Sequence, residues 1–420
     1  MPPRVILGVG AGIAAYKSCE LLRLLTESGH RVRVVPTPDA LRFVGEATWA
    51  ALSGEPVTTD AWTGVSEVPH VRLGQSADLV LVAPATADLM ARAAAGQAGD
   101  LLTATLLTAR CPVLYAPAMH TEMWEHPATQ ANVLLLRSRG AVVLDPAVGR
   151  LTGADSGRGR LPDPDEIFAV AMRLLARGQL GQDLVGRRVV VSAGGTREEL
   201  DPVRFLGNWS TGTPGYALAR TAVARGAEVT VVAANVALAD PAGATVVRVV
   251  SARQMQDAVM AAAATADAVV MAAAVADYRP ETRNTAKIKK NGQPPEPLRL
   301  TENPDILAGL AARRAEQAAQ AEQAAQAEQA EQAAHETGAR QVLVGFAAET
   351  DTSETAARAK LARKGCDLLV VNPVGNGLGF GTPDNQAVIF GADGTVTSVP
   401  RGPKEALADV IWDLVAANLK

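Results

Sequence analysis

Residues 4–35, RVILGVGAGIAAYKSCELLRLLTESGHRVRVV, decide the fold of the first part of the chain. The apolar run at 4–9 predicts a strand, the glycines after it predict a turn, and closely spaced leucines predict a helix over 14–28. A second apolar run at 31–35 predicts the next strand. A strand, loop, helix and strand in this order give parallel strands joined by a right-handed crossover. We therefore expect an α/β domain built on a parallel sheet.

The loop at residues 10–12 is a candidate phosphate site, because backbone N–H groups at a helix start attract anions. It does not match the dinucleotide fingerprint, since Ile13 stands where the third glycine would fall. The second strand also ends in Pro36 and Thr37, without an acid for an adenosine ribose. The sequence disfavours a nicotinamide cofactor and leaves two alternatives, a mononucleotide such as FMN or a plain tight turn.

A third buried strand is predicted over residues 79–83, followed by Pro84, Ala85 and Thr86. Open α/β sheets bind ligands at the carboxyl ends of their strands. Small residues with one hydroxyl at this place suit a flat ring or a phosphate.

A second domain is predicted after a polar, glycine-punctuated joint at residues 177–186. A fresh strand at 188–192, a glycine loop, a helix at 216–225 and a strand at 228–233 repeat the parallel pattern. We expect domains at 1–180 and 181–420.

Residues 271–290, MAAAVADYRPETRNTAKIKK, carry the clearest chemical signal of the second half. Small residues close a buried strand, Asp277 stands at its exit, and a polar loop ends in Lys287, Lys289 and Lys290. Alanines let a ligand lie against the backbone, the acid can bind an OH or NH group or a metal, and lysines meet phosphates as point charges. This order suits a triphosphate; the alternative is a strand followed by a solvated basic loop.

Composition excludes several classes of partner. Of the 420 residues, 48% are hydrophobic, and the formal net charge of −4 gives no reason to expect nucleic acid or an anionic membrane. Cys19, Cys111 and Cys366 fit no metal or disulfide pattern and are typical of a reduced cytosolic protein. The first residues lack a signal-peptide arrangement, and no long apolar run suits a membrane span. We expect a cytoplasmic protein.

An AEQ-rich insert, about residues 311–338, interrupts the second half. Alanine, glutamate and glutamine favour a helix, but the repeat has nothing larger than alanine to bury. We interpret it as an extension outside the active site. A coiled-coil partner helix is the alternative, although no leucine or isoleucine seam supports it.

Four motifs in the first half resemble the flavin-dependent phosphopantothenoylcysteine decarboxylase family: GAGIAAYK (10–17), PHV (69–71), APATADLMARAAAG (83–96) and PAMHTEMW (117–124). The resemblance implies a flavodoxin-like domain, with FMN at a subunit interface of a trimer. It makes His70 catalytic and gives His120 a role in the same site. The residues that it implies for FMN binding are Gly10, Gly12, Ile13, Thr37, Pro84, Ala85 and Thr86.

The chain departs from this family's pattern at two places. His120 stands where most members have asparagine, and both side chains can donate a hydrogen bond to a carboxylate. In the flap, GRLTGADSGRGRL (149–161), Gly153 stands where the family has a proton-donating cysteine. Three explanations stay open: Asp155, Ser156 or Arg158 replaces the cysteine, a water does so, or the second half-reaction is impaired.

The second half resembles the phosphopantothenate–cysteine ligase family in GGTREELDPVRFLGNWSTG (194–212), AAAVADYR (272–279), KIKK (287–290), NPDI (303–306) and GFAAET (345–350). The resemblance implies a Rossmann-like α/β domain in which Asn208 stabilises an acyl-nucleotide. Mg²⁺ is expected with the nucleotide, on ligands that the sequence does not identify. The residues implied for CTP binding are Met271, Ala272, Ala273, Asp277, Lys287, Pro304, Asp305, Ile306, Leu307, Phe346, Lys360 and Lys364.

Together the two resemblances imply a bifunctional enzyme of coenzyme A biosynthesis. Its substrates would be 4′-phosphopantothenate, cysteine and CTP, with FMN as cofactor and neither nucleic acid nor a membrane as partner. The families imply a homo-oligomer, with trimeric flavin domains and dimeric ligase domains combined in a dodecamer. Two alternatives remain, an active ligase fused to an impaired flavin domain and a non-catalytic flavin-binding regulatory or scaffold protein.

Overall fold

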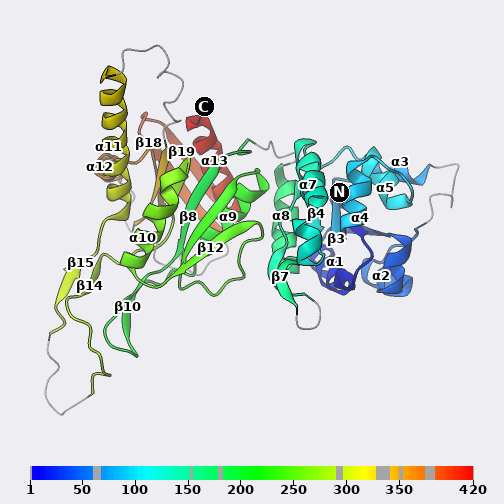
Figure 1. Ribbon diagram of the computed structural model, residues 1–420, viewed down its shortest axis with the longest axis horizontal. Helices are drawn as coiled ribbons and strands as arrows, with labels where there is room; N and C mark the ends of the chain where they lie inside the picture. Colours follow the sequence, from blue (N-terminus) through cyan, green and yellow to red (C-terminus); the bar gives the residue numbers. More distant parts are fainter. Residues whose placement is uncertain are drawn as a thin grey trace. The chain divides into compact units, whose positions relative to one another are not determined.

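The computed structural model in Figure 1 describes residues 2–59, 68–151, 155–177, 183–289, 297–327, 341–349, 353–373 and 384–419. The chain divides into two compact units. The first is Met1–Asp183 with two short additions, Val223–Gly226 and Pro241–Gly243, and the second holds the remaining residues. Each unit is built on its own main sheet, so each is described by itself.

The first unit contains a five-stranded parallel sheet in the order β2-β1-β3-β4-β5 within the described residues. Its strands are β1 (Arg4–Val9), β2 (Arg31–Pro36), β3 (Leu79–Ala85), β4 (Val113–Pro117) and β5 (Val142–Val143). A short antiparallel hairpin, β6 (Ala147–Arg150) and β7 (Ser156–Arg160), follows. This strand order is the flavodoxin-like one, which confirms the predicted parallel α/β class.

Helices cover both faces of this sheet. They are α1 (Lys17–Glu27), α2 (Glu46–Ser53), α3 (Pro69–Ser76), α4 (Ala87–Ala94), α5 (Leu101–Thr108), α6 (Thr121–Glu125), α7 (Pro127–Ser138) and α8 (Pro164–Arg177). The helix predicted at 14–28 begins instead with a 3-10 turn, η1 (Ile13–Tyr16), before α1.

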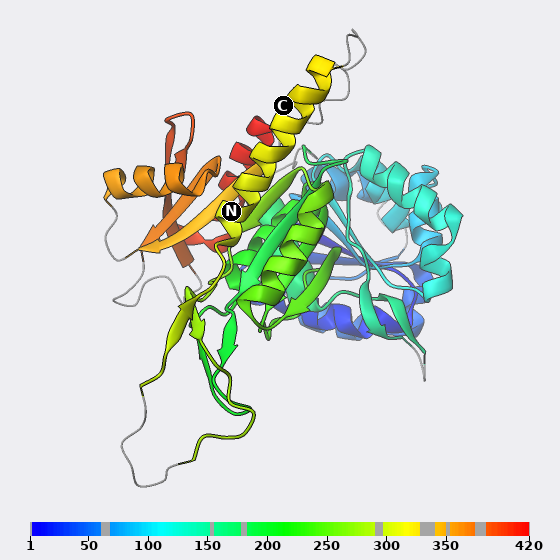
Figure 2. The ribbon, with the colours of Figure 1, turned by 60° about the vertical axis from the view of Figure 1, so that its left-hand side comes forward.

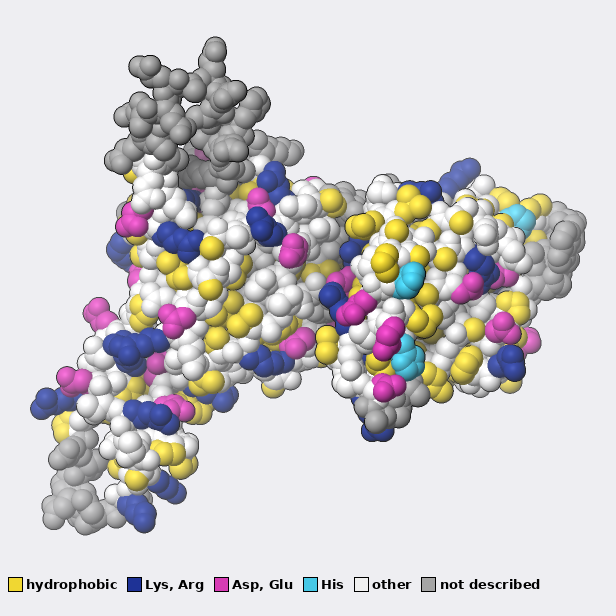
Figure 3. All heavy atoms as spheres, in the orientation of Figure 1, with side chains coloured by type: hydrophobic (Ala, Val, Ile, Leu, Met, Phe, Trp, Pro, Cys, Tyr) yellow, Lys and Arg dark blue, Asp and Glu magenta, His cyan; other side chains and the backbone are white. Residues whose placement is uncertain are grey.

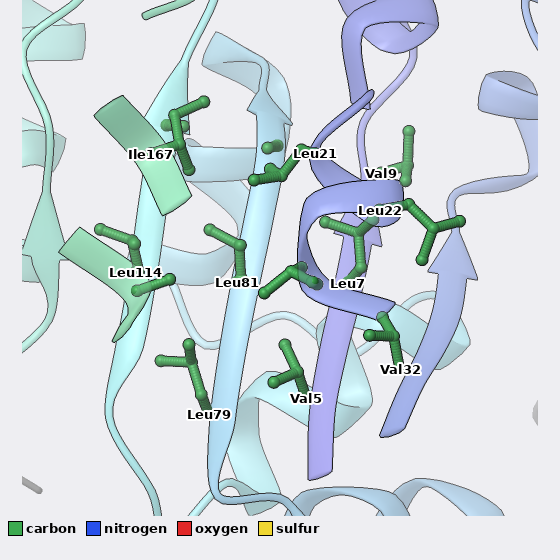
Figure 4. Close-up of a cluster of buried hydrophobic side chains, with 14 of the residues drawn as sticks. Val5, Leu7, Val9, Leu21, Leu22, Val32, Leu79, Leu81, Leu114 and Ile167 are labelled. Atoms are coloured by element: carbon green, nitrogen blue, oxygen red, sulfur yellow. The ribbon is translucent and has the colours of Figure 1, made fainter. Parts of the chain in front are cut away.

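The alternation of side chains along β1 produces two apolar clusters, one on each face of the sheet. Leu7 points into the cluster that α1 and α8 cover with Leu21 and Ile167 (Figure 4). Ile6 points to the opposite face and packs with Leu73 of α3. Burial on both faces explains why these strands read as nearly continuous apolar runs.

The second unit contains an eight-stranded sheet in the order β12-β11-β8-β13-β16-β17-β18-β19 within the described residues. The strands are β8 (Arg188–Gly194), β11 (Glu228–Ala234), β12 (Ala244–Val249), β13 (Ala268–Met271), β16 (Val342–Glu349), β17 (Leu368–Pro373), β18 (Asp384–Gly391) and β19 (Val396–Pro403). The strands up to β17 pair in parallel, as predicted. Strands β18 and β19 add an antiparallel edge that was not predicted from the sequence.

The helices of the second unit are α9 (Thr213–Ala224), α10 (Ala252–Ala262), α11 (Ile306–Ala327), α12 (Glu354–Lys364) and α13 (Lys404–Asn418). Helices α10, α11 and α12 supply Met255, Leu307 and Leu361 to one apolar cluster. Trp412 of α13 packs against α9 and donates its indole N–H to the Leu218 carbonyl at 3.0 Å. The core of the second unit therefore continues on both sides of the sheet.

Two small antiparallel pairs form an arm on the second unit. One is β9 (Arg197–Glu199) with β10 (Phe205–Gly207), and the other is β14 (Tyr278–Pro280) with β15 (Leu300–Glu302). Figure 2 shows both pairs extending away from the sheet. In Figure 3, side chains of both charges lie close together over the arm.

Helix α11 contains the start of the AEQ-rich insert. Its first turns are buried through Ile306, Leu307 and Leu310. Arg313 donates to the Met260 carbonyl at 2.7 Å, and Arg314 pairs with Asp367. The repeat begins directly afterwards, and residues 315–320 are exposed. Residues 328–338 of the predicted insert lie outside the described residues. Across the described part of the chain, no helix has both the length and the apolar character needed to cross a membrane.

Candidate active sites

The candidate site of the first unit is a cavity of about 730 Å³ at the carboxyl edge of its sheet. Strands β1 and β3 are neighbours there, while the connections that follow them leave toward opposite sides, which is where open α/β sheets bind ligands. The loops after β1, β3 and β4 and the β6–β7 hairpin form its walls. The lining residues from these segments include Gly12, Ile13, Tyr16, Lys17, Pro84, Thr86, Met119, His120, Arg150 and Arg160.

A second cavity of about 300 Å³ shares Ala11, Thr86 and Asp88 with the first. Thr37 lines it, and the Thr37 hydroxyl is buried without a hydrogen-bond partner in the described structure. A buried hydroxyl without a partner is costly, so a ligand oxygen at this place would satisfy it. The two cavities together offer a large apolar pocket and a polar extension beside the glycine loop.

Gly10 and Ala85 are predicted FMN residues that do not line either cavity. Ala85 is fully buried in the apolar core. The Gly10 N–H donates to the Pro84 carbonyl at 3.0 Å, and a Cβ on Gly10 would lie 2.6 Å from that same oxygen. Glycine is therefore needed at position 10 so that the loops after β1 and β3 can approach each other. Gly10 shapes the site rather than facing it.

The two predicted catalytic histidines lie apart in one chain. His120 ends the loop after β4 and lines the large cavity. His70 is the second residue of α3 and does not line that cavity. Its Nδ1 atom is buried without a partner in the described structure, and its carbonyl accepts a hydrogen bond from Thr108 Oγ1 at 2.7 Å. A single copy of the first unit thus brings only His120 to the cavity.

Two cationic residues that line the cavity, Lys17 and Arg160, were not predicted as site residues. Asp163 accepts two hydrogen bonds from Arg160, at 2.8 and 2.9 Å, and lies 3.6 Å from Lys17 Nζ. The Arg160 Nε atom is buried without a partner in the described structure. Lys17 stood inside the quoted motif GAGIAAYK, but nothing in its spacing distinguished it from a surface lysine.

The flap is only partly described, because position 153 lies outside the described residues. Of the three side chains considered as replacements for the family cysteine, Arg158 pairs with Asp145. The cavity is lined by Arg150, Gly159 and Arg160 from this hairpin, and by none of the three. Cys19, Cys111 and Cys366 are free thiols, and none of them lines the cavity. Burial raises the pKa of each thiol, that of Cys366 to about 11.

In the second unit, the predicted ligase residues gather where β8 and β13 lie side by side. The chain leaves β8 toward β11 and later returns to place β13 on the other side, which again makes a switch point. Ala274, which follows β13, connects that segment to the end of β8. Its N–H donates to Gly194 O at 2.8 Å, and its carbonyl accepts from Thr196 N at 3.1 Å. Asn208 Nδ2 donates to the same carbonyl at 3.0 Å. The predicted catalytic asparagine is therefore fixed against the AAAVAD segment.

Two buried hydroxyls hold this segment in place. Ser192 Oγ accepts from the Ala273 N–H at 3.0 Å, and Thr196 Oγ1 accepts from the Ala276 N–H at 2.9 Å. Asn303 then brings the NPDI segment alongside, because its side-chain amide donates to the Ala276 carbonyl at 2.9 Å. Asp277, the last residue of the AAAVAD segment, is exposed, and its backbone carbonyl accepts a hydrogen bond from the Asn303 N–H at 2.8 Å.

The predicted lysine pair on α12 is held by carboxylates. Lys364 Nζ lies 2.5 Å from Asp305 Oδ2, and Lys360 Nζ lies 2.7 Å from Glu349 Oε1. Burial alone would raise the pKa of Asp305, but the hydrogen bond from Lys364 and the Ala308 N–H outweigh it and hold that pKa below its ordinary value. Asp305 and Lys364 were predicted separately, and the structure brings them into contact.

Other predicted CTP residues sit deeper. Ile306, Leu307 and Met271 are buried in the apolar cluster, so they support the site from beneath, and Phe346 is half-buried on β16. Lys287 is exposed, whereas Lys290 lies outside the described residues. Among the residues that the structure describes, no group of three or more His, Cys, Asp or Glu side chains is arranged to hold a metal ion.

In the comparison with known proteins, the two units match different family models. Residues 2–176 match the family model described as Flavoprotein. Residues 184–340 and 330–419 match the model of the DNA/pantothenate metabolism flavoprotein C-terminal domain. The Coenzyme A biosynthesis bifunctional protein CoaBC of Mycobacterium tuberculosis H37Rv is 56% identical, over 100% of this chain and 97% of that protein. The chain belongs to the bifunctional coenzyme A biosynthesis family.

The family is also matched at greater distance. The protein of the same description from Vibrio cholerae is 41% identical over 98% of this chain and 97% of its own length. A crystal structure of the C-terminal domain of a CoaBC protein is 32% identical, with a TM-score of 0.43, and covers 56% of this chain and 97% of that one. Membership makes the chain an enzyme of coenzyme A biosynthesis with ligase and decarboxylase activities. It does not favour the alternatives of an impaired flavin half or a non-catalytic scaffold.

Proposed function

We propose that the second unit joins 4′-phosphopantothenate to cysteine using CTP. A carboxylate is too poor an electrophile to acylate an amine in neutral water. Attack of the carboxylate oxygen on the α-phosphorus of CTP breaks the α–β phosphate bond, forms an acyl-cytidylate and releases pyrophosphate. The amine of cysteine then attacks the acyl carbon, CMP leaves, and an amide remains. The fixing of Asn208 to the Ala274 carbonyl at the β8–β13 switch point is the observation that carries this assignment.

The described residues suit a negatively charged nucleotide. Lys287 is exposed on the segment that follows β14, and Lys364 lies in an ion pair with Asp305 that a phosphate can replace. Mg²⁺ would accompany CTP and neutralise phosphate charge. The exposed Asp277 carboxylate is an oxygen donor of the kind that this ion accepts. Asn208 holds the acyl-cytidylate, and the lysines hold the departing pyrophosphate.

The first unit decarboxylates the amide product, 4′-phosphopantothenoylcysteine, with FMN. Its two joined cavities, the unpartnered Thr37 hydroxyl and the exposed apolar side chains of Ile13 and Tyr16 fit a phosphorylated ring system. Bound FMN supplies the electron sink that loss of CO2 from a cysteine carboxylate needs. His120 donates a hydrogen bond to the substrate carboxylate, while Lys17 and Arg160 attract its anionic groups.

The separation of the two histidines supports a site shared between copies of the chain. We assign His70 to the cavity of a neighbouring subunit in a trimer of flavin domains, where it positions substrate or moves protons. Exposed large apolar side chains on the arm, Phe205, Tyr278 and Leu300, support pairing of ligase domains in dimers, with a dodecamer as the full assembly. The three free cysteines favour a reducing, cytoplasmic location.

The two activities can be tested separately in the full-length, flavin-loaded protein. With CTP, Mg²⁺, 4′-phosphopantothenate and cysteine, it should release pyrophosphate and CMP in equal amounts, followed by CO2. Asn208→Ala should reduce pyrophosphate and CMP release but leave CO2 release from added 4′-phosphopantothenoylcysteine intact. His70→Asn should do the reverse. A wild-type protein that forms no pyrophosphate would overturn the ligase assignment.

The same assay addresses the flap. Mass spectrometry of the decarboxylation products should show the thiol. Accumulation of an oxidised ene-thiol would mean that the chain without a flap cysteine fails to complete the second half-reaction, and would support the alternative of an impaired flavin half.

A further inference from the structure

Three neighbouring strands of the second sheet, β8, β11 and β12, end side by side. The last residue of the middle strand β11, Ala234, is in register with Gly194 on one side and with Val249 on the other. Asn235 comes next in the chain. It therefore lies just beyond the middle strand, at the same carboxyl edge of the sheet at which the predicted ligase residues gather.

The side-chain amide of Asn235 connects the segments that leave the two flanking strands. Its Nδ2 atom donates to the Gly195 carbonyl at 2.9 Å and to the Val250 carbonyl at 3.0 Å. Gly195 is the first residue after β8, and Val250 is the first residue after β12. An amide NH2 group has two hydrogens, so one side chain can donate to both carbonyls. The three strand ends are thereby held together one residue beyond the last pairs of the sheet.

The backbone of Asn235 indicates what its side chain contributes. The φ angle of Asn235 is 53°, in the left-handed region that few residues other than glycine occupy and that asparagine tolerates better than most. Glycine would adopt this backbone conformation at a lower cost, but it could donate to neither carbonyl. The two hydrogen bonds are therefore what asparagine adds at this position.

Gly195 is the point at which Asn235 acts on the candidate ligase site. Gly195 is buried, and a buried carbonyl needs a donor. A Cβ on Gly195 would lie 3.3 Å from the Asn208 carbonyl oxygen and 3.6 Å from the Asn208 Cβ, so Gly195 packs directly against the predicted catalytic asparagine. The next N–H, that of Thr196, donates at 3.1 Å to the Ala274 carbonyl, which also accepts from Asn208. Movement of Gly195 would therefore disturb both the packing and the hydrogen bond that fix Asn208.

We propose that Asn235 is a positioning residue of the ligase reaction, which fixes Gly195 so that Asn208 can hold the acyl-cytidylate until cysteine attacks. This inference rests on the proposed function of the second unit. Asn235 acts through Gly195 and Asn208 rather than on the reacting atoms. When Asn208 is misplaced, water attacks the acyl carbon in place of cysteine. CMP then leaves, one proton passes to solvent and 4′-phosphopantothenate is regenerated, so that CMP is released without formation of the amide.

The test is the ratio of CMP released to amide formed, measured by chromatography on the full-length, flavin-loaded protein with CTP, Mg²⁺, 4′-phosphopantothenate and cysteine. The amide is counted together with its decarboxylated form. The wild type should give equal amounts of CMP and amide. Asn235→Gly keeps the backbone conformation and removes the donor, so CMP should exceed the amide. The kcat for amide formation should fall about tenfold, which corresponds to about 1.4 kcal/mol, the contribution of one or two neutral hydrogen bonds. The KM for CTP should change little, because Asn235 bonds to Gly195 and Val250, and neither is a predicted CTP residue.

Asn418→Gly is the matched control, because the exposed Asn418 side chain also donates to a carbonyl, that of Leu414 at 2.8 Å, but within helix α13. This variant should release CMP and amide equally. Asn235→Asp keeps the shape of the side chain but turns a carboxylate toward the two carbonyls. It should release excess CMP as Asn235→Gly does, and it replaces that variant if glycine prevents folding.

The ratio separates positioning from stability alone. A merely structural role of Asn235 would lower the thermal midpoint of the variants and leave CMP and amide equal. Equal release in both Asn235 variants would therefore overturn the proposal, whatever their thermal midpoints. A wild-type protein that releases no pyrophosphate in this assay would overturn the proposed ligase function itself, and this role of Asn235 with it.

Discussion

The Asp201 carboxylate accepts a hydrogen bond from the backbone N–H of Ile288 at 3.1 Å, and so ties the loop after β9 to the basic loop that carries Lys287 and Lys289. Arg204 strengthens the tie, because it pairs with Asp201 at 2.6 Å and donates to the Ile288 carbonyl at 2.6 Å. Asp201 is buried despite its charge. Burial would raise the pKa of Asp201, but its several hydrogen-bond donors hold that pKa far below the ordinary value.

Replacing Asp201 by Asn should therefore release the basic loop. We expect the KM for CTP to rise several-fold, because the lysines lose their fixed position, while decarboxylation of added 4′-phosphopantothenoylcysteine is unchanged. Initial rates of pyrophosphate release measure the first effect. Asp257→Asn, on the exposed face of α10, is the control. An unaltered KM in Asp201→Asn would mean that the lysines do not depend on this tie.

The Asp305–Lys364 pair allows a sharper test of the nucleotide site. Lys364→Ala should raise the KM for CTP with little loss of stability, since ion pairs as exposed as this one contribute about 0–1 kcal/mol. The exchanged variant, Asp305→Lys with Lys364→Asp, restores the pair but moves the positive charge. We expect its thermal midpoint to match the wild type and its KM for CTP to stay high. Recovery of the KM would show that the pair is structural only.

Gly159 offers a test of the cavity of about 730 Å³ that we propose binds FMN. A Cβ at this position would lie 2.2 Å from the Met119 carbonyl, whereas the Met119 N–H donates to Gly159 O at 3.0 Å. Gly159→Ala should push the hairpin away from the loop that carries His120 and lower the flavin bound per chain, measured by visible absorbance after gel filtration. Gly45→Ala, where a Cβ meets nothing within 4 Å, should keep its flavin. Full flavin content in both variants would contradict the tight contact.

The first unit should lose stability in acid through Asp100. Burial raises the pKa of Asp100, but the Thr103 N–H and Arg92, whose guanidinium lies 2.6 Å away, outweigh it and lower the pKa below its unfolded value. A lowered folded pKa means that the carboxylate stabilises the fold above the unfolded value, about 3.9, and that this contribution disappears as the pH falls through the folded value.

Asp100→Asn should accordingly lower the thermal midpoint at pH 7, by an amount that corresponds to about 1 kcal/mol for a weakened helix cap, and the difference from the wild type should shrink below about pH 4. Thermal melts of both proteins from pH 3 to 8 measure this. Asp39→Asn, whose side chain is 77% exposed, should show no such trend. A constant difference across the range would exclude the ionised carboxylate as the cause.

The fold followed from local sequence where apolar runs and glycine turns alternated. The strands β1, β2 and β3 and the helix α9 lie at or near the residues that periodicity predicted. The antiparallel strands β18 and β19 were not predicted, because no local sequence pattern indicates their pairing. The AEQ-rich repeat indicated a helix, but its attachment through Arg313 and Arg314 required the tertiary structure.

The sequence could predict which residues belong to the candidate sites where a family motif contains them. It could not predict how those residues are arranged in space. Asn208, Asp305 and Lys364 were named from the family resemblance, whereas the contacts of Asn208 with Ala274 and of Asp305 with Lys364 came only from the fold; their roles stay predictions. Sequence could not reveal that Gly10 shapes the flavin cavity without facing it, that His70 lies away from the cavity of its own chain, or that Arg158 is engaged with Asp145. Asp201 stood in a quoted motif, yet its partner Ile288 is far along the chain, so no spacing pointed to it.

Helix α11 is fixed by Ile306, Leu307, Leu310 and the two arginines, and beyond Arg314 it is exposed through residue 320. Its outer turns can therefore be lengthened, shortened or replaced without moving the NPDI segment at its base. That makes the outer helix a natural attachment point: a fluorophore or an affinity tether joined there would report on the enzyme while leaving both chemistries undisturbed.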